Sequence, residues 1–348
     1  MERSKIHRGK GACLLARAGF FVLLSLGFFH LSSCDGVNTP GVAGSGRVLP
    51  NINGSAGEVL VVMDENSWQG DAGEHLQDIL KEEIPGLPQS EPLFDVMQIS
   101  PGAFENAVLY HRTIVLTTVS SGKESRLSYR EDVWARPQIV LQLEASSGEE
   151  LDRLIRDNDG QIQSFLIQHD RDRLIAIYRD TKDEGIQQKI VENHQIQLAV
   201  PRGYNLDFSK DEYTSVSIES SDMSQVIQVY DFPADGPDAL STENLLSKRN
   251  EFTRKYVAGP RDGSYMTISP LYPPQVFDVK MGNREVVEIR GLWELENGYM
   301  GGPFISHAVY DEARNRVVVV DGYIYYPNQK KRVKLKQVEA IVYSMELM

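Results

Sequence analysis

The stretch EVVEIRGLWEL (residues 285–295) is typical of a long β-strand, because apolar residues at 287, 289, 293 and 295 alternate with charged residues at 288, 290 and 294. Two similar stretches follow it, FISHAVY (304–310) and RVVVVDGYIYY (316–326). Strands joined by connections this short pair antiparallel, since a parallel pair needs a crossover of a dozen or more residues. These three stretches therefore predict an antiparallel meander as the centre of the fold.

The remaining periodic segments predict further strands and helices on either side of the meander. Strands are expected at 58–63, 94–99, 113–119, 138–143, 196–200, 214–220, 225–232 and 264–269, and helices at 71–83, 148–168, 171–178, 186–193, 242–256 and from about 329. Helices and strands segregate rather than strictly alternate, which favours an α+β fold with largely antiparallel sheets packed with helices. We expect two subdomains, an N-terminal one over 58–185 and a C-terminal one over 186–348.

Residues 1–33 have the layout of a lipoprotein signal peptide, with basic residues followed by a short apolar run. The apolar run, 18–29, is too short for a transmembrane helix, which needs roughly 20 residues. Leu-Ser-Ser-Cys at 31–34 is similar to the bacterial lipobox, so we expect Cys34 to carry the lipid. An ordinary signal peptide with an incidental cysteine is the alternative. The Gly-, Pro-, Asn- and Ser-rich stretch that follows, within 34–57, predicts a flexible tether.

The chain is acidic, with a formal net charge of −13. Cleavage before Cys34 would remove five basic residues and one acidic residue, leaving 31 Lys and Arg against 48 Asp and Glu, a charge of −17. Such a chain is repelled by phosphate backbones, so we expect no nucleic-acid partner. Its membrane attachment is then expected to come from the lipid on Cys34, at the outer membrane and facing the periplasm.

The sequence contains none of the short motifs by which common catalytic and metal centres are identified. His-Glu-x-x-His, Gly-x-Ser-x-Gly and a Walker A loop do not occur, and the histidines are scattered. Asp-Asn-Asp-Gly at 157–160 resembles a calcium loop, but an EF-hand register would place Ile155 and Leu166 at its ligand positions. We therefore expect no metal and no cofactor.

The meander offers one candidate surface for a ligand or partner. Alternate residues of a strand share a face, so several polar side chains of these three strands could converge. The candidates are Glu288, Arg290, Glu294, His307, Asp321 and Tyr323. Such a surface could bind a polar ligand or perform acid–base chemistry. The alternative is the solvated side of a one-sided sheet. The basic run at 330–336 is expected to be solvated or to pair with acidic neighbours.

Several segments spread along the chain point to one family. They are Gly57–Asp64, Pro85–Gln89, Trp134–Gln138, Gly259-Pro260 with Gly263–Met266, Arg290–Glu294, Met300–Phe304 and Glu339–Ile341. Together they resemble the uncharacterised Bacteroidetes lipoproteins called domain of unknown function 4837. The resemblance implies a cell-envelope lipoprotein, and it brings no assigned activity and no catalytic residues.

The expected function is a lipid-anchored, non-catalytic binding or assembly module of the cell envelope, with an envelope protein as a possible partner. The alternative is a hydrolase-like envelope enzyme that uses the polar surface around Glu288, Arg290, Glu294 and His307. The acidic stretch that marks surface-exported lipoproteins in that phylum is absent after Cys34, where only Asp35 is acidic.

Overall fold

The computed structural model describes residues 48–348 of the chain. The predicted signal peptide, the predicted lipid-attachment residue Cys34 and residues 34–47 of the predicted tether lie outside the described residues. Within 48–348, no helix has the length and apolar character needed to cross a membrane.

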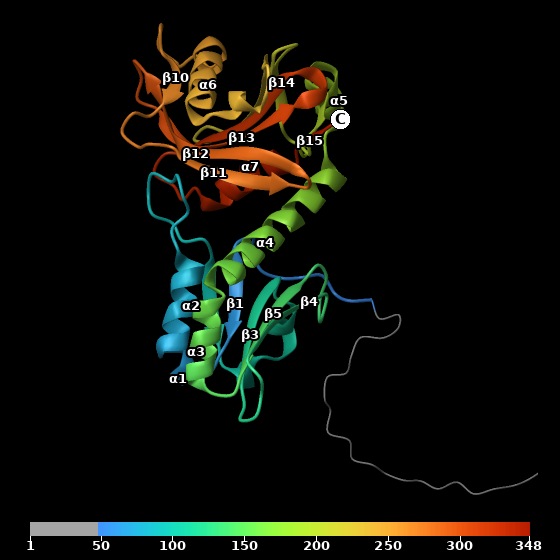
Figure 1. The fold of residues 1–348 in the computed structure, drawn as a ribbon, viewed down its shortest axis with the longest axis vertical. Coiled ribbons are helices and arrows are strands. Elements are labelled where there is room, and N and C mark those ends of the chain that lie inside the picture. Colours follow the sequence, from blue (N-terminus) through green and yellow to red (C-terminus); the bar gives the residue numbers. More distant parts are fainter. Residues whose placement is uncertain (1–47) are drawn as a thin grey trace, which may run out of the picture. The chain divides into compact units, whose positions relative to one another are not determined.

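The first part of the described chain forms a five-stranded sheet (Figure 1). Its strands are β1 (Glu58–Val62), β2 (Asp95–Ile99), β3 (Thr113–Val119), β4 (Arg126–Glu131) and β5 (Ile139–Ala145), in the order β2-β1-β3-β5-β4. The pairs β1–β2, β1–β3 and β3–β5 are parallel, and only β4 is antiparallel to its neighbour. This sheet thus departs locally from the antiparallel pairing that dominates the rest. The sequence did not predict β4, whose residues are largely exposed.

Four helices accompany this sheet: α1 (Glu65–Trp68), α2 (Asp71–Lys81), α3 (Gly148–Asp157) and α4 (Asp159–Thr181). The single helix predicted over 148–168 is wrong, because the helix breaks at Asn158 and then continues to Thr181. The Asn158 side-chain amide donates to the Leu154 carbonyl at 2.8 Å and closes the end of α3. The apolar stripe nevertheless runs through both helices, which is why the break was not visible in the periodicity.

The predicted meander is the centre of an eight-stranded antiparallel sheet. Its strands are β7 (Asn205–Lys210), β8 (Tyr213–Glu219), β9 (Ser224–Pro233), β10 (Tyr265–Ile268), β11 (Gln275–Met281), β12 (Arg284–Glu296), β13 (Gly301–Asp311) and β14 (Arg316–Tyr325). The order is β10-β12-β13-β14-β9-β8-β7, and β11 also pairs with β12. The predicted α+β class with largely antiparallel sheets is therefore confirmed.

The shorter elements complete the C-terminal part of the chain. α5 (Glu184–His194) is followed by β6 (Ile196–Gln197), which pairs with β15 (Glu346–Leu347) near the C-terminus. The strand predicted over 196–200 is thus only two residues long. Gln195, between α5 and β6, has a left-handed backbone that ends the helix.

Helices cover both faces of the eight-stranded sheet. α7 (Arg332–Tyr343) lies on the face formed by alternate residues of β14 such as Val318 and Val320. α6 (Thr242–Tyr256) lies on the opposite face with Val319 and Tyr323. Gly322 allows the close approach of α7, because a side chain there would collide with Val338. A sheet covered in this way has no solvated polar face, so the one-sided alternative for the meander is wrong.

Candidate functional site

The β12–β13 register creates a buried group of charges on the α7 face of the sheet. Glu288 lies directly opposite His307 in this register, and Arg290 follows on the same face of β12. Glu288 Oε1 accepts from Arg290 Nε at 2.7 Å, and its Oε2 lies 2.8 Å from His307 Nε2. All three side chains are buried, and Glu288 is only 4% exposed. The three therefore form one connected unit rather than separate surface charges.

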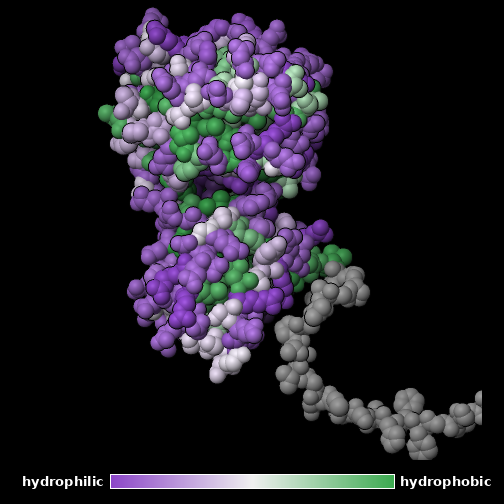
Figure 2. Space-filling model, viewed as in Figure 1, coloured by the Kyte–Doolittle hydropathy of each residue, from purple (hydrophilic) through white to green (hydrophobic). Residues whose placement is uncertain are grey.

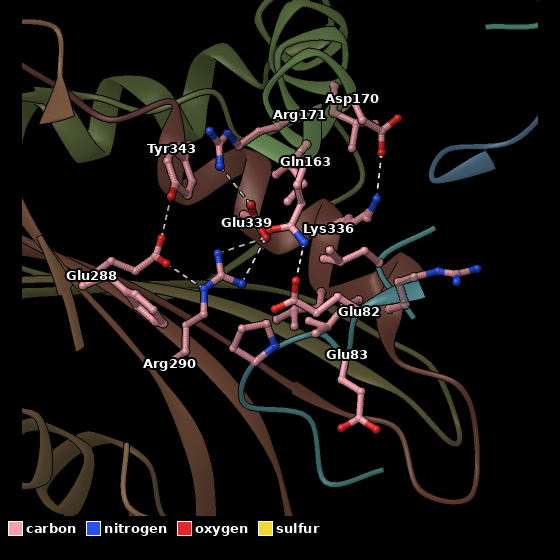
Figure 3. A pocket seen from close by; sticks show the side chains of 18 residues that line it. Glu82, Glu83, Gln163, Asp170, Arg171, Glu288, Arg290, Lys336, Glu339 and Tyr343 are labelled. Atoms are coloured by element: carbon pink, nitrogen blue, oxygen red, sulfur yellow. Dashed lines mark hydrogen bonds and ion pairs between the residues drawn. The ribbon is translucent and has the colours of Figure 1, made fainter. Parts of the chain in front are cut away.

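Helices α7 and α4 complete this unit (Figure 3). Tyr343 Oη donates to Glu288 Oε2 at 2.7 Å, and Arg290 donates to Glu339 at 3.2 Å. Glu339 and Tyr343 are four residues apart on α7, so they project from the same side of that helix. Arg171 of α4 donates to Glu339 at 3.1 Å. We call these six residues, including His307, the charge network.

The charge network shifts the pKa values of Glu288 and His307 in the same direction. Burial opposes ionisation of Glu288, but the Arg290 charge and the His307 hydrogen bond outweigh it and hold the pKa of Glu288 well below its usual range. Burial lowers the pKa of His307, against the opposing effect of Glu288. His307 is thus neutral, with its Nε2–H donated to Glu288. Its Nδ1 is buried and has no partner within the described residues.

A cavity of about 210 Å³ lies against the charge network. Apolar side chains from several elements form much of its lining, namely Ile84, Pro85, Leu93, Ile167, Leu174, Phe277 and Leu335. Glu82 and Glu83 also line it, and neither has a cation within 4.0 Å among residues 48–348. Figure 3 shows Gln163 reaching Glu82, while the Glu83 carboxylate points away from the charge network. The cavity therefore combines apolar walls with a charged floor.

A second cavity, of about 600 Å³, shares Arg171 and Tyr343 with the first. It is lined by later residues of α4, by the β11–β12 hairpin and by the chain near Glu346. Arg171 lies over the Tyr343 ring, with its guanidinium carbon 3.5 Å from the ring centre, and forms the common wall. We call the two cavities together the α4 groove. Figure 2 shows a hollow with apolar atoms beside it between α4 and the β11–β12 side.

Asp170 of α4, which also lines the smaller cavity, has three cationic side chains around it. It accepts from Lys336 at 3.0 Å and from Arg112 at 3.2 Å, and Arg173 lies 3.5 Å away. Burial opposes ionisation of Asp170, but these cations lower its pKa. Burial and the nearby Arg112 charge lower the pKa of Arg173 to about 10. Lys336 belongs to the basic run at 330–336, so the pairing with acidic neighbours that the sequence left open occurs at this residue.

The other three sequence-predicted residues lie elsewhere. Glu294 accepts from Ser269 Oγ at 2.6 Å and lines a different cavity. Asp321 and Tyr323 lie on the α6 face of the sheet, and Asp321 accepts from Arg249 Nε at 2.7 Å. The structure therefore brings together Glu288, Arg290 and His307, and separates them from the remaining candidates.

A separate set of hydrogen bonds links Asp231, His194 and Thr214 in the acid–histidine–hydroxyl order of a catalytic triad. His194 Nδ1 lies 2.6 Å from Asp231 Oδ2, and its Nε2 lies 2.9 Å from Thr214 Oγ1. A nucleophile must meet its substrate, yet Thr214 is 1% exposed and His194 is fully buried. These residues are well placed to join α5 to β8 and β9. No group of three or more His, Cys, Asp and Glu side chains within 48–348 is arranged to hold a metal ion.

Sequence reasoning missed the helical members of the charge network, Arg171, Glu339 and Tyr343. The one available signal was the spacing of Glu339 and Tyr343, which places two polar groups one turn apart in the largely apolar second half of that helix. Nothing in the sequence linked Arg171, 168 positions before Glu339, to the same place.

Two family models match the chain. Residues 183–344 match the domain of unknown function DUF4837, and residues 53–179 match the domain of unknown function DUF8532. The predicted resemblance to this family is thus supported over 183–344. The three resembling segments before residue 139 lie within the range of the second model instead.

No curated protein matches the chain. Among solved structures, the Ran-binding protein Mog1p of Saccharomyces cerevisiae is 13% identical, with a TM-score of 0.29, covering 44% of this chain and 90% of that chain. LpqN of Mycobacterium tuberculosis, involved in cell envelope biogenesis, is 14% identical, with a TM-score of 0.26, covering 43% and 81%. Human STARD10 is 10% identical, with a TM-score of 0.21, covering 46% and 79%. At these TM-scores none of the three bears on function.

Proposed function

We propose that this chain, whose residues 183–344 match the domain of unknown function DUF4837, is a non-catalytic binding module of the cell envelope that holds its ligand or partner in the α4 groove. The observation that carries the proposal is the charge network beneath an open cavity. Both carboxylate oxygens of Glu288 are engaged, by Arg290 on one side and by His307 and Tyr343 on the other. Such a floor is rigid and pre-organised, which favours binding.

The same network gives weaker support to the hydrolase alternative. A general base needs a pKa near the working pH and access to the proton that it removes. The pKa of Glu288 is held far below that range, and His307 is fully buried. Glu294, the fourth residue of the hydrolase hypothesis, lines another cavity. What this arrangement supports is recognition of shape and charge.

The place of this module in the cell is also part of the proposal. The basic leader, the short apolar run and Cys34 support a lipid-anchored protein, and the lipid would hold an acidic chain at a membrane. We infer attachment at the outer membrane with the folded part in the periplasm, in a lipoprotein of the Bacteroidetes type.

The test is a comparison of two matched variants of α4. Leu174→Trp would fill the smaller cavity, whereas Ile177→Trp changes a residue that is 51% exposed and lines neither cavity. Each protein is purified from native envelopes, and co-purifying proteins and small molecules are identified by mass spectrometry. We expect a species that is retained by the wild type and Ile177→Trp and is lost from Leu174→Trp. Identical spectra for all three proteins would count against the proposal.

A further inference from the structure

Strand β11 forms a free edge of the eight-stranded sheet. It pairs with β12 from Gln275 to Met281, and no strand within the described residues pairs with its other side. No further backbone hydrogen bond involves these seven residues within 48–348. In an antiparallel pair, alternate N–H and C=O groups point away from the partner strand. β11 therefore presents an unused row of donors and acceptors, the feature to which an extended peptide can add as a strand.

The free edge runs beside both cavities of the α4 groove. Phe277 lines the smaller cavity, and Lys280 and Met281 line the larger one. Side chains of an added strand would project alternately to its two faces, about 3.4 Å apart along the chain. A strand along β11 could thus place its side chains in both cavities while its backbone pairs with the edge. This is how peptide-binding sheets combine affinity with selectivity.

The larger cavity is lined by more basic than acidic side chains, although the chain as a whole is acidic. Arg171, Arg179, Lys280 and Arg284 line it, against Asp172 and Glu346. Arg171 and Arg179 already pair with Glu339 and Glu346, at 3.1 and 2.5 Å. Lys280 and Arg284 are exposed, and neither has an acidic partner within 4.0 Å among residues 48–348. Lys280 lies opposite Glu285 in the β11–β12 register, but it forms no ion pair with it, so both cations are available to an anionic partner.

From the free edge and these two cations, we infer that the α4 groove takes an extended, acidic segment of another protein, added as a strand to β11 with its carboxylates against Lys280 and Arg284. This inference rests on the proposed binding role and names the class of partner. The contact requires no covalent step. It would orient the partner along β11, and the apolar lining near Phe277 would receive an uncharged side chain.

The test uses a fluorescein-labelled octapeptide of alternating valine and glutamate, with the full chain held in detergent. Fluorescence anisotropy is expected to show saturable binding that weakens at least tenfold in Lys280→Glu/Arg284→Glu. The matched peptide of valine and lysine is expected to bind at least tenfold more weakly than the glutamate peptide. Both substituted positions are exposed, and circular dichroism verifies that the variant is folded.

Two N-methylated peptides separate strand addition from simple charge attraction. One carries N-methyl groups on the odd residues and the other on the even residues, so only one of them blocks the N–H groups that face β11. We expect one peptide to lose binding and the other to keep it. Equal binding of the two, or equal binding of the lysine peptide, would overturn the inference.

Two further outcomes identify other occupants. If light scattering shows a dimer that Lys280→Glu/Arg284→Glu dissociates, a second copy occupies the edge and the inference is wrong. If no acidic peptide binds while the species lost from Leu174→Trp is still retained by Lys280→Glu/Arg284→Glu, the inference fails and the proposed binding role stands. If no species depends on Leu174 and no peptide binds, both fail.

Discussion

Arg171 on α4 lies over Tyr343 on α7, with its guanidinium carbon 3.5 Å from the centre of the ring. This contact joins two helices that are far apart in sequence and forms the wall shared by both cavities. The same tyrosine donates its hydroxyl to Glu288, so the wall is tied to the buried floor of the groove. Tyr343 therefore links the wall of the α4 groove to the buried charge network.

Tyr343→Phe tests this coupling. It removes the 2.7 Å hydrogen bond to the Glu288 carboxylate and keeps the ring beneath Arg171. A hydrogen bond to a charged group contributes about 2 kcal/mol, so the free energy of unfolding in urea is expected to fall by about that amount. Tyr299→Phe is the control, because Tyr299 is 72% exposed. Equal stability of the two variants would show that the Tyr343 hydroxyl does not hold the network.

The Arg249–Asp321 pair on the opposite face of the sheet should behave as a buried ion pair. Both side chains are almost fully buried, and Gln228 also donates to Asp321 at 2.6 Å. Arg249→Met or Asp321→Leu alone leaves a buried charge without its partner and is expected to cost about 3–5 kcal/mol. The double variant should recover a large part of that loss in urea unfolding.

The control for this cycle is the exposed pair Lys255–Glu212. Its removal by paired alanine substitutions is expected to leave the free energy of unfolding almost unchanged, because solvent screens an exposed pair. Strictly additive losses at Arg249 and Asp321 would mean that the two charges do not stabilise each other.

The neutral state of His307 predicts a pH dependence. Burial lowers its pKa in the folded chain below 6.5, the value of a free imidazole. The unfolded chain therefore binds a proton near pH 6.5 that the folded chain does not, and the free energy of unfolding falls as the pH drops below that value. Glu288 acts in the same direction at lower pH, because its folded pKa is depressed below 4.5. Its contribution is lost only as the pH falls below about 4.5.

His307→Gln keeps a donor for Glu288 and removes the titrating ring. Between pH 7 and 5.5 the variant is expected to lose less stability than the wild type, by up to about 1.4 kcal/mol per pH unit. Some slope remains, because burial also lowers the pKa of His111. Urea midpoints measured at each pH provide the comparison, and parallel curves for the two proteins would contradict a neutral, buried His307.

The predicted lipid anchor has a direct test in Cys34→Ala. Labelling with a radioactive fatty acid is expected to disappear, and the protein should move from the membrane to the soluble fraction. Cys13→Ala is the matched control, because Cys13 precedes the apolar run and is removed with the leader if cleavage occurs before Cys34. Retention of the label in Cys34→Ala would refute the anchor.

Sequence reasoning brought Glu288, Arg290 and His307 together because a strand repeats every two residues and the meander fixed three neighbouring strands. The same rule put Glu294 with them, but six residues along a strand span about 20 Å, which takes Glu294 away from the network. Glu294 lies on the same face of β12 as Glu288, but it is too far along the strand to contact the charge network.

The placement of Asp321 and Tyr323 depended on strand register. His307 pairs with Val320, so Asp321 points to the other face of the sheet. A shift of one residue would have reversed this, and periodicity alone does not fix it. Arg171, Glu339 and Tyr343 come from helices whose docking depends on tertiary packing. The free edge of β11 was missed as well, because QVFDVKM (275–281) mixes charged and apolar residues without clean alternation.

Site-specific photo-crosslinking tests the central claim, occupancy of the α4 groove, most directly. Benzoylphenylalanine is introduced at Glu83, an exposed residue that lines the smaller cavity, or at Ile177, which is also exposed and lines neither cavity. Intact cells expressing each full chain are irradiated, and adducts are identified by mass spectrometry. We predict a discrete adduct from position 83 that is absent from position 177. The same adducts from both positions, or none from position 83, would contradict a binding role for the groove.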